Sequence, residues 1–256
     1  MAQIIAFVNQ KGGVGKTTSA VNIASYLASF GKRILLVDLD PQGNATSGLG
    51  IAKEKLEKSI YDVLCGRLEI SEILYQGLQK SLHIAPASSA LSGASVELVN
   101  LPEREFLLKK ALNPAKGDYD YIIIDSPPSL GILTINALTA ADHVAIPVQC
   151  EYYALEGLSQ LLFTLDLVQK NLNPELNILG VILTMRDKKT RIASDVVREV
   201  QRNFPGKVFE TIVPRNVRLA EAPSFGQAIL NYEPSCKGAR AYKHLAQEII
   251  NLNGNQ

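Results

Sequence analysis

The chain has 256 residues and a formal net charge of +1, with 46% hydrophobic and 20% charged residues. This composition excludes a disordered or collagen-like chain, and the overall charge predicts no particular partner. No stretch reaches the roughly 18 apolar residues that would indicate a membrane-spanning helix. Cys65, Cys150 and Cys236 are far apart in the sequence, which argues against a disulfide framework or a zinc site and favours a reducing, cytoplasmic setting.

Short β-branched runs alternate with helical patterns along the chain. The expected strands are residues 4–8, 33–37, 82–85, 121–124, 144–148, 178–183 and 208–213. The expected helices are residues 16–30, 104–112, 155–171 and 194–203, followed by a last helix near the end of the chain. Residues 43–58 contain three glycines and mixed charges, and we expect an irregular, mobile or ligand-dependent loop there. The alternation predicts one α/β domain over residues 1–256, with a twisted, mostly parallel sheet and helices on both faces.

Residues 11–18, Lys-Gly-Gly-Val-Gly-Lys-Thr-Thr, lie between the first expected strand and the first expected helix. Glycines let backbone N–H groups approach phosphate oxygens closely, and the following helix presents its positive end to the anion. This pattern predicts a P-loop that binds ATP and Mg²⁺, with Lys16 at the β- and γ-phosphates and the Thr17 hydroxyl as a direct metal ligand. Thr18 can add a hydroxyl near the α-phosphate. Gln10 stands where the ordinary pattern has its first glycine.

Two further apolar strands end in carboxylates, where α/β folds bind ligands. Asp38 and Asp40 follow residues 33–37, and since strand side chains alternate they point roughly the same way. One could hold Mg²⁺ through water while the other orients an attacking water. Asp125 ends residues 121–124 in a Walker B arrangement that supports the magnesium shell. Asp-Pro and Asp-Ser-Pro-Pro could also simply end the strands, but the three motifs together are far more specific.

The lysine before the glycine pair makes residues 11–18 similar to the deviant Walker A motif of the ParA/MinD group. Residues 38–50, 125–131, 147–157 and 214–224 resemble the ParA/Soj partition ATPases, so the likeness covers nearly the whole chain. The resemblance implies an ATPase that forms a homodimer with two nucleotides between its subunits.

The same resemblance assigns roles to residues. Lys11, Lys16 and Asp40 would be catalytic, with Lys11 reaching the nucleotide of the other subunit and Asp40 positioning the hydrolytic water. Asp38 and Asp125 would support the metal through water. The residues implied in ATP binding are Lys11, Gly12, Gly13, Val14, Gly15, Lys16, Thr17, Thr18, Pro214 and Asn216.

The late part of the chain is basic: residues 180–243 hold twelve Lys and Arg against six Asp and Glu. A solvated surface explains this charge as well as an anionic partner does. The family resemblance favours non-specific double-stranded DNA, and it also implies a ParB/Spo0J-like centromere-binding partner and a nucleoid-associated protein. Backbone phosphates need only positive charge within reach. The candidate DNA-binding residues are Arg186, Lys188, Lys189, Arg191, Arg215 and Arg218.

Two alternatives belong to other classes. A membrane-associated division-site regulator of MinD type would use the apolar stripe of the last helix, formed by Ala239, Tyr242, Ala246, Ile249 and Ile250. No Lys or Arg follows Lys243, whereas interfacial helices carry basic residues, so we expect this helix to dock on the core without stable membrane association. An iron–sulfur carrier would need closely spaced cysteines, but Ser126 follows Asp125 and C-x-x-C is missing.

Overall fold

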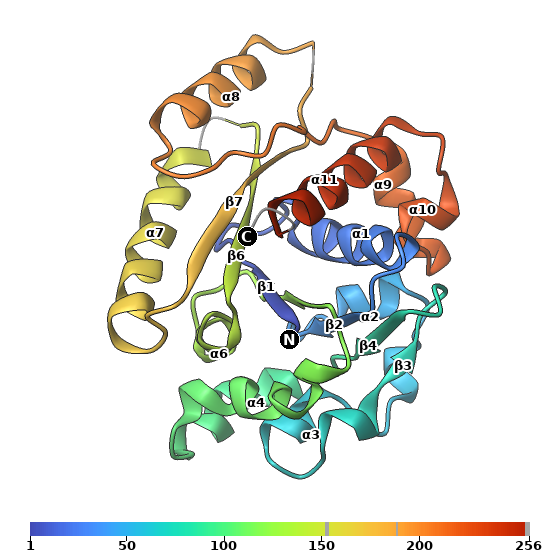
Figure 1. Cartoon of the computed structure of the whole chain (residues 1–256), viewed down its shortest axis with the longest axis vertical. Helices are drawn as coiled ribbons and strands as arrows, with labels where there is room; N and C mark the ends of the chain where they lie inside the picture. Colours follow the sequence, from blue (N-terminus) through green and yellow to red (C-terminus); the bar gives the residue numbers. More distant parts are fainter. Residues whose placement is uncertain (152–153, 188, 254–256) are drawn as a thin grey trace.

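The computed structural model describes residues 1–151, 154–187 and 189–253 (Figure 1). In these residues a seven-stranded sheet has the strand order β3-β4-β2-β5-β1-β6-β7. The strands are β1 Gln3–Phe7, β2 Ile34–Asp38, β3 Tyr75–Gln76, β4 Leu82–Ala85, β5 Tyr121–Asp125, β6 His143–Gln149 and β7 Asn177–Thr184. Every pairing is parallel except that of β3 with β4. The predicted α/β fold with a mostly parallel sheet is confirmed.

Helices cover both faces of the sheet, as predicted (Figure 1). The α-helices are α1 Lys16–Ser29, α2 Asn44–Gly48, α3 Ile60–Leu64, α4 Leu91–Glu97, α5 Leu107–Leu112, α6 Ile132–Ala140, α7 Ala154–Asn171, α8 Arg191–Asn203, α9 Val217–Glu221, α10 Ile229–Tyr232 and α11 Lys237–Asn253. The 3-10 turns are η1 Lys53–Lys55, η2 Ile70–Ile73, η3 Leu98–Asn100, η4 Arg104–Phe106, η5 Pro114–Gly117 and η6 Ala222–Phe225. Helices α1, α10 and α11 pack on one face, and α3 to α8 pack on the other.

The central strand β1 shows why the sequence forms this layered arrangement. Ile4 and Ala6 belong to the hydrophobic cluster under α3 to α8, while Ile5 and Phe7 belong to the cluster under α1 and α11. All four side chains are fully buried. Because both faces are covered, every position of a central parallel strand can be apolar, and the carboxyl end of β1 leads directly into residues 11–18.

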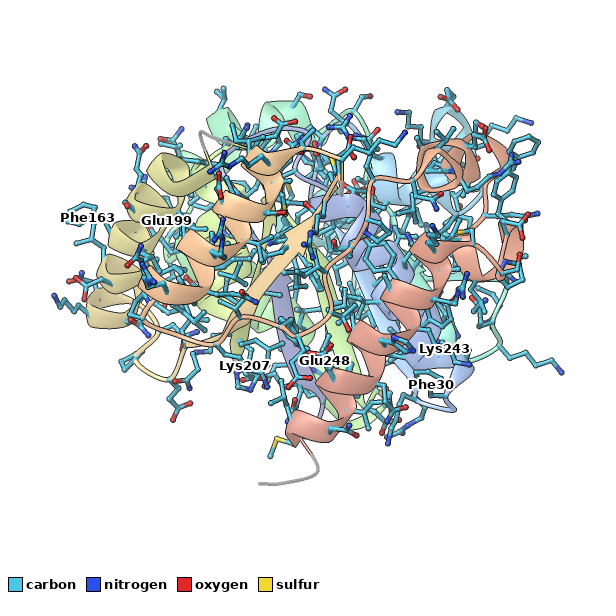
Figure 2. The ribbon with its side chains drawn as sticks, turned by 90° about the horizontal axis from the view of Figure 1, so that it is seen from above. Phe30, Phe163, Glu199, Lys207, Lys243 and Glu248 are labelled. Carbon is cyan, nitrogen blue, oxygen red and sulfur yellow. The ribbon has the colours of Figure 1, made fainter. Side chains whose placement is uncertain are left out.

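The prediction of a strand over residues 208–213 is wrong. Its two ends do bond to β7, since the N–H of Phe209 donates to Val181 O and the N–H of Val213 donates to Leu183 O, each at 2.9 Å. Between them, the N–H groups of Glu210 and Thr211 donate instead to the carboxylate of Glu248, each at 3.0 Å. Glu248 lies on α11 and is labelled in Figure 2. The side chain of a distant helix therefore replaces the ladder bonds in the middle of this segment.

Two other segments bear on the predictions. Within residues 43–58, where we expected an irregular loop, Asn44–Gly48 forms the short helix α2. The last helix packs on α1 as predicted, with Ala239, Tyr242, Ala246 and Ile249 at most 1% exposed and the Tyr242 hydroxyl 3.1 Å from Ser19 Oγ. In the part of the chain that the structure describes, every helix is too short or too polar to cross a bilayer.

Candidate nucleotide-binding site

Residues 9–15 form a loop between β1 and α1. Gly13 and Gly15 have φ angles of +73° and +89°, a region that strains residues with a Cβ. The Lys16 ammonium lies 3.4 Å from the carbonyl oxygen of Lys11, and the Thr184 hydroxyl donates to Val14 O at 2.8 Å. Burial lowers the pKa of Lys16, while Asp125 and Asp40 act in the opposite direction. The loop thus surrounds one buried cation that is suited to an anionic ligand.

Asp38 and Asp125 lie side by side, because they are partners in the register of the parallel strands β2 and β5. Both side chains are fully buried. Asp38 is well satisfied: Oδ1 accepts from the N–H of Asp40 at 3.1 Å, and Oδ2 accepts from the N–H and the hydroxyl of Thr46 at 2.8 and 2.7 Å. Burial raises the pKa of Asp38 to about 6, against the lowering effect of the bonds from Thr46.

Asp125 is in a different position, since neither of its carboxylate oxygens has a hydrogen-bond partner within the described residues. Burial raises the pKa of Asp125 well above its ordinary value, and the carboxylate of Asp38 raises it further. Lys16 and the nearby Thr17 hydroxyl, which does not reach hydrogen-bond geometry with either oxygen, oppose this rise. An unpartnered buried carboxylate is costly unless a cation or its bound water approaches, so this side chain fits the outer shell of a hydrated Mg²⁺ ion.

Asp40 sits at the entrance of the same site. It is 6% exposed, its Oδ1 accepts from the N–H of Gln42 at 2.9 Å, and its charge acts on Lys16. The structure therefore brings Lys16, Asp38, Asp40 and Asp125 together at the carboxyl ends of β1, β2 and β5, where ligands of α/β folds bind.

A cavity of about 340 Å³ opens beside Gly15 and Thr18, and its far side includes Pro214 and Asn216. A second cavity of about 340 Å³ shares Thr18 with it and extends along α2. Asn216 caps α9, with its Oδ1 accepting from the N–H of Arg218 at 2.9 Å. Met185, whose φ of +53° is unusual for a residue with a side chain, lines the first cavity, and such strain is often found at functional sites. The combined space can hold a base and sugar beside the phosphate loop.

The candidate DNA-binding residues that the structure describes follow β7 in the chain, on connections and at or near the starts of α8 and α9. Arg186 is half-buried, and its backbone bonds to those of Val213 and Arg215. Lys189 and Arg191 are exposed at the start of α8. Arg215 pairs with Glu151 at 3.2 Å, and Arg218 pairs with Glu221 at 2.7 Å. Lys188 lies outside the described residues.

Sequence reasoning missed several polar side chains that shape the site. Thr46 holds Asp38, Asn9 donates to Pro147 O at 2.7 Å, Gln10 bonds to α7, and Glu151 lies 4.0 Å from Lys11. Only Gln10 carried a sequence signal, as a departure from the ordinary glycine. Thr46 is eight residues from Asp38, but no motif marks it as the partner of that carboxylate, and the partners of Asn9 and Glu151 are far away in sequence.

The chain was compared with known proteins. Residues 2–178 match a family model described as an AAA domain. The sporulation initiation inhibitor protein Soj of Bacillus subtilis is 57% identical over 249 residues, which cover 97% of this chain and 98% of that protein. The chromosome-partitioning ATPase Soj of Treponema pallidum is 53% identical over 256 residues, with complete coverage of both chains. The chain belongs to the ParA/Soj family of chromosome-partitioning ATPases.

The family's nucleotide chemistry has a structural counterpart. A crystal structure of cobyrinic acid a,c-diamide synthase from Mycobacterium smegmatis with bound ADP and magnesium has a TM-score of 0.87 and 39% identity to this ParA/Soj member. The match covers 98% of this chain and 94% of the other. That structure contains the ligand classes that the loop and its carboxylates were predicted to bind.

Proposed function

We propose that this ParA/Soj family member is a Mg²⁺-dependent ATPase that partitions DNA as an ATP-bound homodimer. The observation that carries the proposal is that the two lysines of the loop differ in burial and in surroundings. Lys16 is 6% exposed and lies inside the loop. The side chain of Lys11 is 37% exposed, and its ammonium lies 4.0 Å from Glu151 outside the loop. Lys16 can serve the subunit's own phosphates while Lys11 remains available to the nucleotide of a second subunit.

Magnesium would be held by the Thr17 hydroxyl directly and by Asp125 through water. When bound, the ion offsets charge on the β- and γ-phosphates. Asp38 already accepts three hydrogen bonds, so its main role is to fix α2 and the backbone of Asp40, and any contact with a metal-bound water is additional. Of the two buried carboxylates, Asp125 would therefore contribute more to metal binding than Asp38.

Asp40 is placed to orient an attacking water. It lies at the mouth of the site, and the N–H of Gln42 holds one of its oxygens. The other carboxylate oxygen can accept a proton from water, and the field of Lys16 stabilises negative charge that develops on the phosphates. Hydrolysis would remove the γ-phosphate from the dimer interface and so return the protein to free subunits.

The anionic partner of the dimer would be the DNA backbone. Lys189 precedes α8, Arg191 begins α8 and Arg218 lies in α9, and all three are exposed. They need no base-reading element to contact phosphates. Family membership supports the proposal of a ParB/Spo0J-like partner that would stimulate hydrolysis. A MinD-like membrane role has less support, because the apolar stripe of α11 is buried against α1.

Light scattering after size exclusion tests the proposal, using the Asp40→Ala variant with ATP, with ADP and with neither, each with and without short duplex DNA. We expect dimers only with ATP, no turnover, and DNA bound only by the dimer. Asp166→Ala, which removes an exposed carboxylate of α7 that pairs with Lys170, is the matched control and should hydrolyse ATP normally. Unchanged turnover in Asp40→Ala would refute the role of Asp40, and ATP-bound monomers would refute the dimer.

A further inference from the structure

Three consecutive side chains at the start of the phosphate loop contact β6, α7 and the connection between them. Asn9 donates to Pro147 O at 2.7 Å, Gln10 donates to Gln160 Oε1 at 2.9 Å, and Lys11 lies 4.0 Å from Glu151. Gln10 also reaches the carbonyl oxygen of Gly157 at 3.3 Å. The loop is therefore attached to α7 by an amide pair, Gln10 and Gln160, which are separated by 150 positions in the sequence.

The backbone around Lys11 is held on both sides. Its N–H donates to Asn9 Oδ1 at 3.0 Å, and its carbonyl oxygen accepts from Lys16 at 3.4 Å. A fixed backbone fixes the direction in which the Cα–Cβ bond leaves the chain, and so restricts the rotamers available to the side chain. Gln10 adds an attachment to α7 at the residue just before Lys11. A glycine at position 10 would have no side chain to make it.

We propose that Gln10, through its hydrogen bond to Gln160, is a positioning residue that aims Lys11 at the nucleotide of the second subunit. This inference rests on the proposed function, since it assumes that Lys11 acts across the dimer. The hydrogen bonds of the amide pair run only to α7 and involve none of the residues predicted to bind ATP. Its loss should therefore impair dimerisation and leave the subunit's own nucleotide binding intact.

The size of the effect follows from the bond. A neutral, solvent-exposed hydrogen bond changes an equilibrium by roughly two- to fivefold. A symmetric dimer contains the amide pair twice, so its dissociation constant should rise by roughly four- to 25-fold.

The test compares Gln10→Leu, Gln160→Leu, the double variant and Gln160→Glu. The dimer dissociation constant is measured by analytical ultracentrifugation with a non-hydrolysable ATP analogue and Mg²⁺, and the ADP affinity of each variant is measured by calorimetry. We expect both single variants to weaken the dimer, with Gln10→Leu weakening it at least as much as Gln160→Leu because it also loses the bond to Gly157 O. The double variant should match Gln10→Leu, and Gln160→Glu, which keeps the acceptor, should behave as wild type. ADP affinity should stay the same throughout. Gln247→Leu, which removes an exposed amide of α11, is the matched control.

Two results would overturn the inference alone: wild-type dimerisation by Gln10→Leu, or a parallel fall in its ADP affinity, which would indicate a general structural role. Lys11→Ala separates these results from the proposed function. If Lys11→Ala dimerises normally, the cross-subunit role fails and the inference fails with it. If Lys11→Ala remains monomeric while Gln10→Leu dimerises normally, only the inference is wrong.

Discussion

The Thr46 hydroxyl links the candidate site to the sheet, and its removal should have a large and pH-dependent cost. Thr46 is fully buried, and its hydroxyl donates to Asp38 Oδ2 at 2.7 Å and accepts from the N–H of Ala87 at 2.9 Å. Thr46→Val keeps the shape of the side chain but removes both bonds. The N–H of Thr46 still donates to Asp38, so α2 keeps its backbone contact.

The magnitude can be worked from the two bonds. A hydrogen bond to a carboxylate contributes about 1.5–3 kcal/mol, and a buried N–H left without a partner costs about 1–3 kcal/mol. The free energy of unfolding should therefore fall by about 2.5–6 kcal/mol when Asp38 is ionised. The loss of the hydrogen bond to the carboxylate, about 1.5–3 kcal/mol, corresponds to about 1–2 pKa units. In Thr46→Val the pKa of Asp38 should therefore rise from about 6 to roughly 7–8.

The sign of the pH dependence follows from linkage. The pKa of Asp38 is raised on folding, so its contribution to stability is fully present below pH 3.8, the ordinary pKa of an aspartate carboxyl, and is lost as the pH rises through about 6. In Thr46→Val this loss continues up to roughly pH 7–8, because the ionised carboxylate has lost a donor. The gap in stability between wild type and variant should be smaller near pH 5 than near pH 8.5.

Urea unfolding followed by circular dichroism, at both pH values, measures this gap. Thr46→Ser is the control, since it keeps the hydroxyl and removes only a methyl group, and it should lose about 1 kcal/mol at either pH. Equal stabilities of the Val and Ser variants, or a gap that is the same near pH 5 and near pH 8.5, would refute the reasoning.

Three further predictions concern ligands. Charge reversal of Lys189 and Arg218 together should weaken DNA binding without changing ATP-driven dimerisation. In fluorescence anisotropy titrations, the slope of the logarithm of the DNA-binding constant against the logarithm of salt concentration should become less steep by about two units. Affinity equal to wild type would put the DNA surface elsewhere. Asp125→Asn should abolish Mg²⁺-dependent turnover and the thermal stabilisation by Mg-ATP. The melting temperature without ligand should not fall, because the substitution removes a buried charge. Full stabilisation by Mg-ATP would contradict the role assigned to Asp125. Asn216→Asp keeps the acceptor that caps α9 but removes the amide donor beside the cavity, so ADP affinity measured by calorimetry should fall about five- to tenfold; an unchanged affinity would exclude an adenine contact.

Local chemistry allowed the central strands and the loop to be predicted from the sequence. Ile4 to Phe7 are apolar at every position, which indicates a strand covered on both faces. Gly13 and Gly15 adopt the positive φ angles that a phosphate loop needs. Asp38 and Asp125 end apolar runs, and parallel neighbours in a sheet must bring such ends together. Each of these inferences uses only residues that are close in sequence.

The sequence by itself therefore determined the fold class, the phosphate loop and the carboxylates that face it. The tertiary structure decided which carboxylate is satisfied, because Thr46 reaches Asp38 and leaves Asp125 without a described partner. It also decided that residues 210–211 bond to Glu248 rather than to β7, and that Gln10 joins the loop to Gln160 on α7. The pairs with Glu248 and Gln160 join residues that are far apart in the sequence, and even Thr46 and Asp38, which are eight residues apart, follow no periodicity that predicts their contact.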